Sequence, residues 1–193
     1  MPSLKQDSKY NAAKYDLFYN NSQAKKENTE IKRLFNLEFD ENEWIDVGCG
    51  TGFGYTLMPV KSRYLGVDID PNMVYACNSK HKGRFICGDA ENQSFKGNIL
   101  SIFSVNYFKV DSIVRLASQS KNAFVVFYNK PYLKGSASVY CNMESEYLLQ
   151  HEDKSKFIYS VFNSCGFKIS KLLNEPFYYV GVKHGNRSFR RYS

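Results

Sequence analysis

The 193-residue sequence lacks the features that mark membrane-spanning, secreted and metal-dependent proteins. No apolar run approaches the roughly 18 residues that a membrane-spanning helix requires, and the first residues form no apolar signal-peptide core. The five cysteines and three histidines form no Cys-x-x-Cys pair and no His-Glu-x-x-His motif. We therefore predict no membrane span, no metal site and no disulfide framework, and we expect a reducing, cytoplasmic setting.

The sequence also has little excess charge outside its two ends. Residues 1–36 carry seven Lys or Arg against four Asp or Glu, residues 183–193 carry four basic residues and no acid, and the rest is balanced. The simplest interpretation is a solvated tail that aids solubility. The alternative is that the basic ends contact phosphates of a nucleic acid or of a phosphorylated substrate.

What the sequence does contain is an alternation of predicted strands and helices, with enough apolar residues for one globular core. Such alternation predicts an α/β fold: a seven-stranded, mostly parallel sheet with helices on both faces and a C-terminal antiparallel hairpin. The segment 130–152 has no clear period and is expected to be a loop with a short helix. The predicted strands span 43–48, 64–68, 84–87, 99–104, 123–128, 167–173 and 177–183, and the predicted helices between them span 53–58, 71–80, 110–118 and 157–162.

A glycine-rich turn follows the first predicted strand and reads Asp46-Val47-Gly48-Cys49-Gly50-Thr51-Gly52. Three glycines at alternate positions let a ligand approach the backbone closely. The dinucleotide fingerprint G-x-G-x-x-G fails in every register, and no lysine follows closely enough for a phosphate-binding loop. An acidic residue before the glycines would repel pyrophosphate but tolerate a cation, so the turn favours a ligand with an amino-acid tail and no pyrophosphate.

Two acidic segments follow at the ends of the second and third predicted strands. They read Gly66-Val67-Asp68-Ile69-Asp70 and Gly88-Asp89-Ala90-Glu91. In this order, each at a strand's carboxyl end, they and the glycine turn resemble motifs I, II and III of the class I S-adenosylmethionine (SAM) methyltransferases.

The resemblance implies SAM as cofactor and S-adenosylhomocysteine (SAH) as product. It implies that Asp68 accepts hydrogen bonds from both ribose hydroxyls and that Asp89 accepts from the adenine amino group. Apolar contacts to the adenine ring are then expected from Ile69, Met73 and Ala90. The predicted cofactor-binding residues are Asp46, Gly48, Cys49, Gly50, Gly52, Asp68, Ile69, Met73, Asp89, Ala90 and Ser104.

The segment before the first strand, within residues 8–36, is predicted to form one or two helices. Tyr15, Phe18 and Tyr19 fall on one helical face, most simply as core contacts. The run Tyr15-Asp16-Leu17-Phe18-Tyr19 also resembles the opening of many small-molecule methyltransferases, in which this segment covers the cofactor. We therefore divide the chain into a helical cap (1–42), a SAM-binding Rossmann-like domain (43–184) and a basic tail (185–193).

No motif identifies the acceptor of the methyl group. Amino-directed DNA methyltransferases carry the motif Asp/Asn/Ser-Pro-Pro-aromatic after the fourth strand. The residues at that place here read Ser104-Val105-Asn106-Tyr107-Phe108 and contain no proline. The similar run Asn129-Lys130-Pro131-Tyr132 follows the fifth strand instead, and we interpret it as a turn. Cys141 lies too far beyond the fifth strand to be the nucleophile of a cytosine-C5 enzyme. We predict that Tyr19 closes over the methyl group and that Asn106 binds an acceptor amine.

Three functions are therefore consistent with the sequence. The first is methyl transfer by proximity to a small-molecule or nucleoside-type acceptor. The second is methyl transfer to RNA or DNA, with the basic ends as contacts. The third is SAM binding without transferase activity, which the missing acceptor motif and the short, proline-cut helix after the glycine turn would fit.

Overall fold

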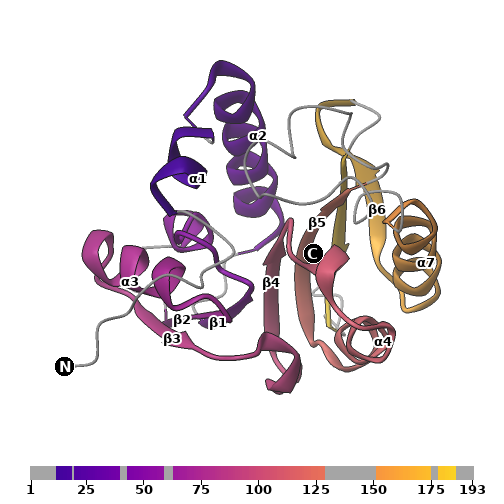
Figure 1. The fold of residues 1–193 in the computed structure, drawn as a ribbon. Coiled ribbons are helices and arrows are strands. Elements are labelled where there is room, and N and C mark those ends of the chain that lie inside the picture. Colours follow the sequence, from indigo (N-terminus) through magenta and orange to yellow (C-terminus); the bar gives the residue numbers. More distant parts are fainter. Residues whose placement is uncertain are drawn as a thin grey trace, which may run out of the picture.

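The protein is described from a computed structural model that covers residues 12–18, 20–39, 43–58, 63–128, 151–174 and 178–185. In this part of the chain a seven-stranded sheet has the order β3-β2-β1-β4-β5-β7-β6. Strands β1 to β5 pair in parallel, and β7 lies antiparallel between β5 and β6 (Figure 1). The strands are β1 Glu43–Val47, β2 Arg63–Asp68, β3 Arg84–Cys87, β4 Asn98–Ile102, β5 Asn122–Tyr128, β6 Lys168–Lys171 and β7 Tyr178–Lys183. The predicted fold class is confirmed.

Helices cover both faces of this sheet, and each face has its own apolar core. Along β5, Phe124 and Val126 belong to one core cluster, whereas Ala123, Val125 and Phe127 belong to the other, because successive side chains of a strand point to opposite faces. The first face is covered by α2 (Ser22–Glu38), the 3-10 helix η1 (Gly54–Leu57) and α3 (Pro71–Lys80). The second is covered by α4 (Val110–Gln119) and α7 (His151–Ser164).

Capping residues fix where the helices near the glycine turn begin. Asn21 caps α2, its Oδ1 accepting from the Ala24 N–H at 2.9 Å. Asp70 caps α3, with Pro71 at the first helical position, as the sequence predicts. The short α1 (Ala12–Phe18) precedes α2 and contacts α3.

Several element boundaries differ from the prediction. The helix expected at 53–58 is a single 3-10 turn. The fourth strand ends at Ile102 instead of residue 104, because Phe103 has a positive φ of 60° that extended backbone does not allow. The strand expected at 167–173 ends at Lys171 for the same reason, since Leu173 has a positive φ of 53°. Helix α7 begins at His151, inside a segment whose apolar residues show no helical period.

Three further 3-10 helices connect the strands: η2 (Ala90–Asn92), η3 (Val105–Tyr107) and η4 (Leu172–Asn174). Among the residues covered, none of the helices combines the length and the apolar character needed to cross a bilayer. The cytoplasmic setting stays a prediction.

Candidate functional site

The glycine turn after β1 requires its glycines. Gly48, Gly50 and Gly52 all have positive φ, at 75°, 53° and 92°. A Cβ on Gly48 would lie 2.4 Å from the Cβ of Ser104, and one on Gly52 would lie 2.7 Å from the His81 ring. Ser104, a predicted cofactor residue, donates its hydroxyl to the Val47 carbonyl at 2.5 Å and so joins the residues after β4 to the turn. The turn is therefore a close-packed backbone surface at the carboxyl end of β1.

Asp68, at the end of β2, holds this turn in place. Its Oδ2 accepts from the Gly50 N–H at 2.7 Å, and its Oδ1 accepts from the Asp70 N–H at 2.9 Å. Burial raises the pKa of Asp68, while these backbone hydrogen bonds oppose the shift. Each carboxylate oxygen can accept a second hydrogen bond, so the predicted role toward two ribose hydroxyls is compatible with the structure.

The residues predicted to bind adenine follow β2 and β3 and differ in exposure. Ile69 is 67% exposed, which is unusual for an apolar residue beside a binding site, whereas Met73 and Ala90 are buried. Asp89 caps η2, its Oδ1 accepting from the Glu91 N–H at 2.9 Å. The structure thus brings Ile69 and Asp89 to the same sheet edge as the glycine turn, and their roles toward adenine stay predictions.

Asp46 is the most unusual residue of the site. It is 2% exposed, and the Tyr64 hydroxyl donates to its Oδ2 at 2.5 Å. Its Oδ1 is buried and has no hydrogen-bond partner in the described structure. Burial raises the pKa of Asp46 to about 7, the Asp68 charge adds to the shift, and the Tyr64 hydrogen bond opposes it.

A cavity of about 370 Å³ lies in front of the glycine turn. Residues of α1, α2, the C-terminal end of α3 and the end of β4 line it together with the glycine turn. Its lining includes Asp16, Asn20, Asn28, Asp46, Lys80, His81, Ile102 and Phe103. The structure therefore places the N-terminal helices at the turn, and the bounds of the three domains stay predictions.

The charges around the cavity largely cancel. Lys80 forms an ion pair with Asp16, which joins α3 to α1. Burial lowers the pKa of His81, so its imidazole is neutral at pH 7. Among the lining residues that the structure describes, Asp46 is therefore the one acid without a cationic partner.

Two thiols lie beneath the turn. Cys77 of α3 approaches the Gly50 carbonyl oxygen at 3.1 Å, and Cys49 is buried beside it. A hydrogen bond with Cys77 and burial both raise the pKa of Cys49, so it stays a thiol. Cys49 therefore fills space within the turn as a buried, neutral side chain, and its predicted contact with the cofactor stays a prediction.

Of the two residues predicted to be catalytic, the structure describes only Asn106. Tyr19 lies outside the described residues. Asn106 is 1% exposed: its Oδ1 accepts from the Tyr128 N–H at 3.0 Å, and its Nδ2 donates to the Ser155 hydroxyl at 3.2 Å. These contacts hold η3 against β5 and α7, a structural role, and the catalytic role of Asn106 stays a prediction.

Sequence reasoning missed Tyr64, Lys80 and His81. The signal for Tyr64 lies in strand register: Asp46 pairs with Gly66, and Tyr64 lies two residues earlier on the same face of β2. The Tyr64 side chain therefore lies on the same face as Asp46, and its hydroxyl donates to the Asp46 carboxylate. Lys80 and His81 reach the site because α3 packs against the turn, and no local sequence pattern indicates this packing.

Comparison with known proteins supports the resemblance seen in the motifs. Residues 45–115 match the family model of a methyltransferase domain. This match spans the glycine turn and the segments of Asp68 and Asp89. A search of curated protein sequences found no match.

Solved structures match most of the chain. The PH0226 protein of Pyrococcus horikoshii OT3 is 15% identical, with a TM-score of 0.60 over 86% of this chain and 92% of its own. Magnesium protoporphyrin IX methyltransferase of Synechocystis PCC 6803, solved with SAM, is 13% identical, with a TM-score of 0.58 over 88% of each chain. The plantazolicin methyltransferase BpumL, solved with SAH and a triazolic desmethylPZN analog, is 14% identical, with a TM-score of 0.59 over 89% of this chain and 90% of its own. At these identities the likeness is one of fold, and the fold is that of the class I methyltransferases.

Proposed function

We propose that the chain is a SAM-dependent methyltransferase that transfers the methyl group of SAM to a small acceptor by proximity. The observation that carries the proposal is the buried Asp46, which lines a cavity beside a turn of three positive-φ glycines and has a carboxylate oxygen, Oδ1, without a partner among the described residues. An unpaired buried acceptor costs about 1–3 kcal/mol, and a ligand's ammonium group would remove that cost.

The residues present fit SAM. The glycine turn gives the close backbone approach, Asp68 retains acceptor capacity for ribose hydroxyls, and Asp46 complements the cationic amino-acid end of the cofactor. When bound, SAM supplies a methyl group already activated by its sulfonium. The chain itself binds, orients and encloses the reactants, with α1 and α2 at one wall of the cavity.

The charge of the cavity favours an acceptor without phosphate. Lys80 is paired with Asp16, His81 is neutral at pH 7, and Asp46 adds negative charge in its ionised form. The described wall of the cavity thus offers a phosphate no unpaired cation, and an acceptor without phosphate suits it better. Magnesium protoporphyrin IX methyltransferase and the plantazolicin methyltransferase are named for small-molecule or peptide acceptors rather than for nucleic acids.

Isothermal titration with SAM and with SAH tests the cofactor assignment. We expect one site per chain in the wild type. Asp68→Asn should bind SAM about 10- to 100-fold more weakly, because hydrogen bonds to a charged group contribute about 1.5–3 kcal/mol. Asp111→Asn, on the exposed first turn of α4, is the matched control and should bind as the wild type does. Absence of heat with both ligands would refute the assignment.

Turnover separates the transferase from a protein that only binds SAM. Wild-type protein and radiolabelled SAM are incubated with panels of amines, hydroxyl compounds and nucleosides, and SAH release is measured. We expect release above background with at least one acceptor that lacks phosphate. Tight SAM binding without release for any acceptor would favour the binding-only function.

A further inference from the structure

We infer that Tyr64 is a positioning residue of the cofactor site: its hydroxyl holds one oxygen of Asp46 so that the other is left for the ammonium group of the cofactor. This inference rests on the proposed function. Tyr64 is not part of the glycine turn, Asp68 or Asp89 motifs, and its hydroxyl donates a hydrogen bond to Asp46.

Three residues shape the space around the Asp46 carboxylate. Tyr64 donates to Oδ2 at 2.5 Å from the neighbouring strand. Gly54 leaves room on the side of η1, since a Cβ there would lie 2.0 Å from the same oxygen. Gly66, the direct partner of Asp46 in β2, places no side chain beside the carboxylate, and a Cβ there would meet Phe85 at 2.6 Å and the Cys49 Sγ at 3.0 Å. The carboxylate is thus fixed through Oδ2, and Oδ1 is its remaining acceptor.

If the hydrogen bond from Tyr64 served stability alone, both oxygens of the buried Asp46 carboxylate would be expected to have partners. Tyr64 is 7% exposed and Asp46 2%, so both side chains are shielded from bulk solvent, and Oδ1 has no partner among the described residues. A buried unpaired oxygen is destabilising, and because Asp46 lines the cavity, a bound cation is the partner that would complete it.

The same hydrogen bond sets when Asp46 carries its charge. Burial disfavours the carboxylate, and the Tyr64 hydroxyl opposes this by lowering the pKa of Asp46. Tyr64 itself stays protonated, because burial and the nearby Asp46 raise its pKa well above the usual value. The titratable and charged groups around Asp46 and its cavity are Tyr64 and Asp68 of β2, Cys49 of the turn, Asp16 of α1, and Lys80 and His81 at the end of α3.

The pH dependence of SAM affinity tests the inference. If the ammonium group of SAM binds the charged form of Asp46, wild-type affinity rises with pH up to about pH 7, changing about tenfold per pH unit well below that point. Above about pH 8 the affinity falls for wild type and variant alike, because the amino group of SAM itself loses its proton. Tyr64→Phe removes the hydrogen bond, so the rise should move upward by about one pH unit. The variant should then bind SAM several-fold more weakly at pH 7 and close to wild type at pH 9.

Tyr55→Phe is the matched control. Tyr55 packs against Tyr64, with ring centroids 5.4 Å apart, and is not part of the cavity lining. It should keep the wild-type pH profile. Carboxyl carbon NMR of Asp46, assigned with Asp46→Asn, should show the same upward shift for Tyr64→Phe in the free protein.

The outcomes separate the two proposals. If wild-type protein binds no SAM, the proposed function and the inference both fall. If wild-type protein binds SAM and Tyr64→Phe lowers stability or affinity equally at every pH, Tyr64 is only structural and the inference alone falls. Should Tyr64→Phe fail to fold, difluorotyrosine at position 64 replaces it: as a stronger donor it should move the affinity profile downward in pH, and an unmoved profile would overturn the inference.

Discussion

Among single residues, Asp46 combines a cost in stability with a proposed role in binding. Its carboxyl group has an ordinary pKa near 4 in the unfolded chain and a pKa of about 7 in the folded protein, because burial disfavours the charge. Between about pH 4 and pH 7 the folded state therefore holds a proton that the unfolded state releases. Stability falls as pH rises through this window and stays lowered above it.

Asp46→Asn should therefore stabilise the protein, and more at pH 8 than at pH 5. Three pH units at about 1.4 kcal/mol each give an upper limit of about 4 kcal/mol for the gain. Urea unfolding at both pH values measures it, with the exposed Asp111→Asn as a control that should show no such dependence. SAM affinity should fall in the same variant. A variant less stable than wild type at pH 8 would contradict this account of Asp46.

Those residues of the site that belong to a short-range sequence pattern could be predicted. The glycines, Asp46 and Asp68 stand out because a turn with positive φ and strand-end acids leave short-range patterns. Tyr64 does not stand out in the sequence, because the register between β1 and β2 decides which residue it contacts. His81 reaches the turn only through the tertiary position of α3.

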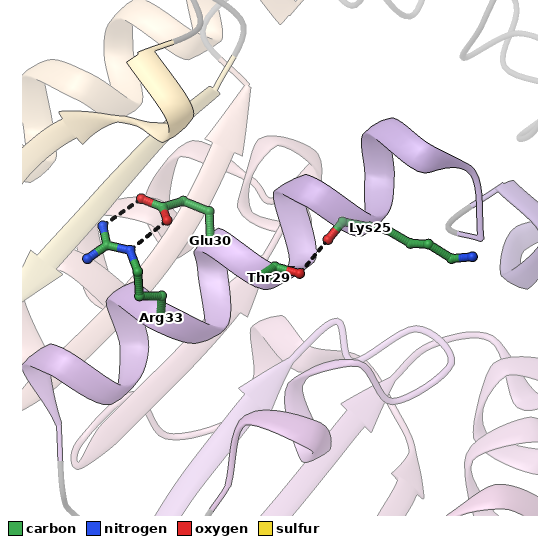
Figure 2. Close-up of polar contacts among 4 residues, drawn as sticks. All are labelled: Lys25, Thr29, Glu30 and Arg33. Carbon is green, nitrogen blue, oxygen red and sulfur yellow. Dashed lines mark hydrogen bonds and ion pairs between the residues drawn. The ribbon is translucent and has the colours of Figure 1, made fainter.

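At the scale of elements, α2 shows which contacts hold the N-terminal helices at the site. Its exposed face carries a bidentate ion pair from Arg33 to Glu30, and the Thr29 hydroxyl donates to the Lys25 carbonyl (Figure 2). Its opposite face buries Ile31 and Phe35, and Phe35 packs edge-on against Trp44 of β1 with ring centroids 5.0 Å apart. Exposed pairs contribute little because water and salt screen them.

Phe35→Ala should destabilise the protein by about 3–5 kcal/mol, because it leaves a cavity between α2 and the sheet. Arg33→Ala, two residues away on the exposed face, should leave the free energy of unfolding close to that of the wild type. Urea unfolding of both variants gives the comparison. A larger loss for Arg33→Ala would mean that the surface pair holds α2.

Element boundaries were less predictable than element types. Helix α3 matches its predicted span because Asp70 and Pro71 give a clear start. Strand β4 ends two residues early, because the positive φ of Phe103 depends on packing near the turn. Helix α7 starts within a segment whose apolar spacing gives no period, so only its later part was visible in the sequence.

At the scale of the whole molecule, the cavity draws its described residues from positions 16 to 103. The described lining thus forms the cavity without a residue beyond 103, and we predict that the basic end is not needed for the proposed cofactor site. We expect deletion of residues 186–193 to leave SAM affinity within about twofold of wild type, as measured by titration. A large loss would show that the tail contributes to the cofactor site.

The same deletion tests the nucleic-acid alternative. If the basic end contacts phosphates, affinity for single-stranded RNA should fall steeply with salt and drop on deletion. RNA binding that is absent, or indifferent to the deletion, would leave the small acceptor as the better account.

The position of β7 has a consequence for how the chain acquires its fold on the ribosome. Strand β7 lies between β5 and β6, although both are synthesised before it. Until residues 178–183 emerge, β5 has an open hydrogen-bonding edge, and β6 has no neighbour among the described strands. Unpaired edges invite pairing with other chains, so a nascent protein that already contains the glycine turn, Asp68 and Asp89 still depends on its final strand for protection against aggregation.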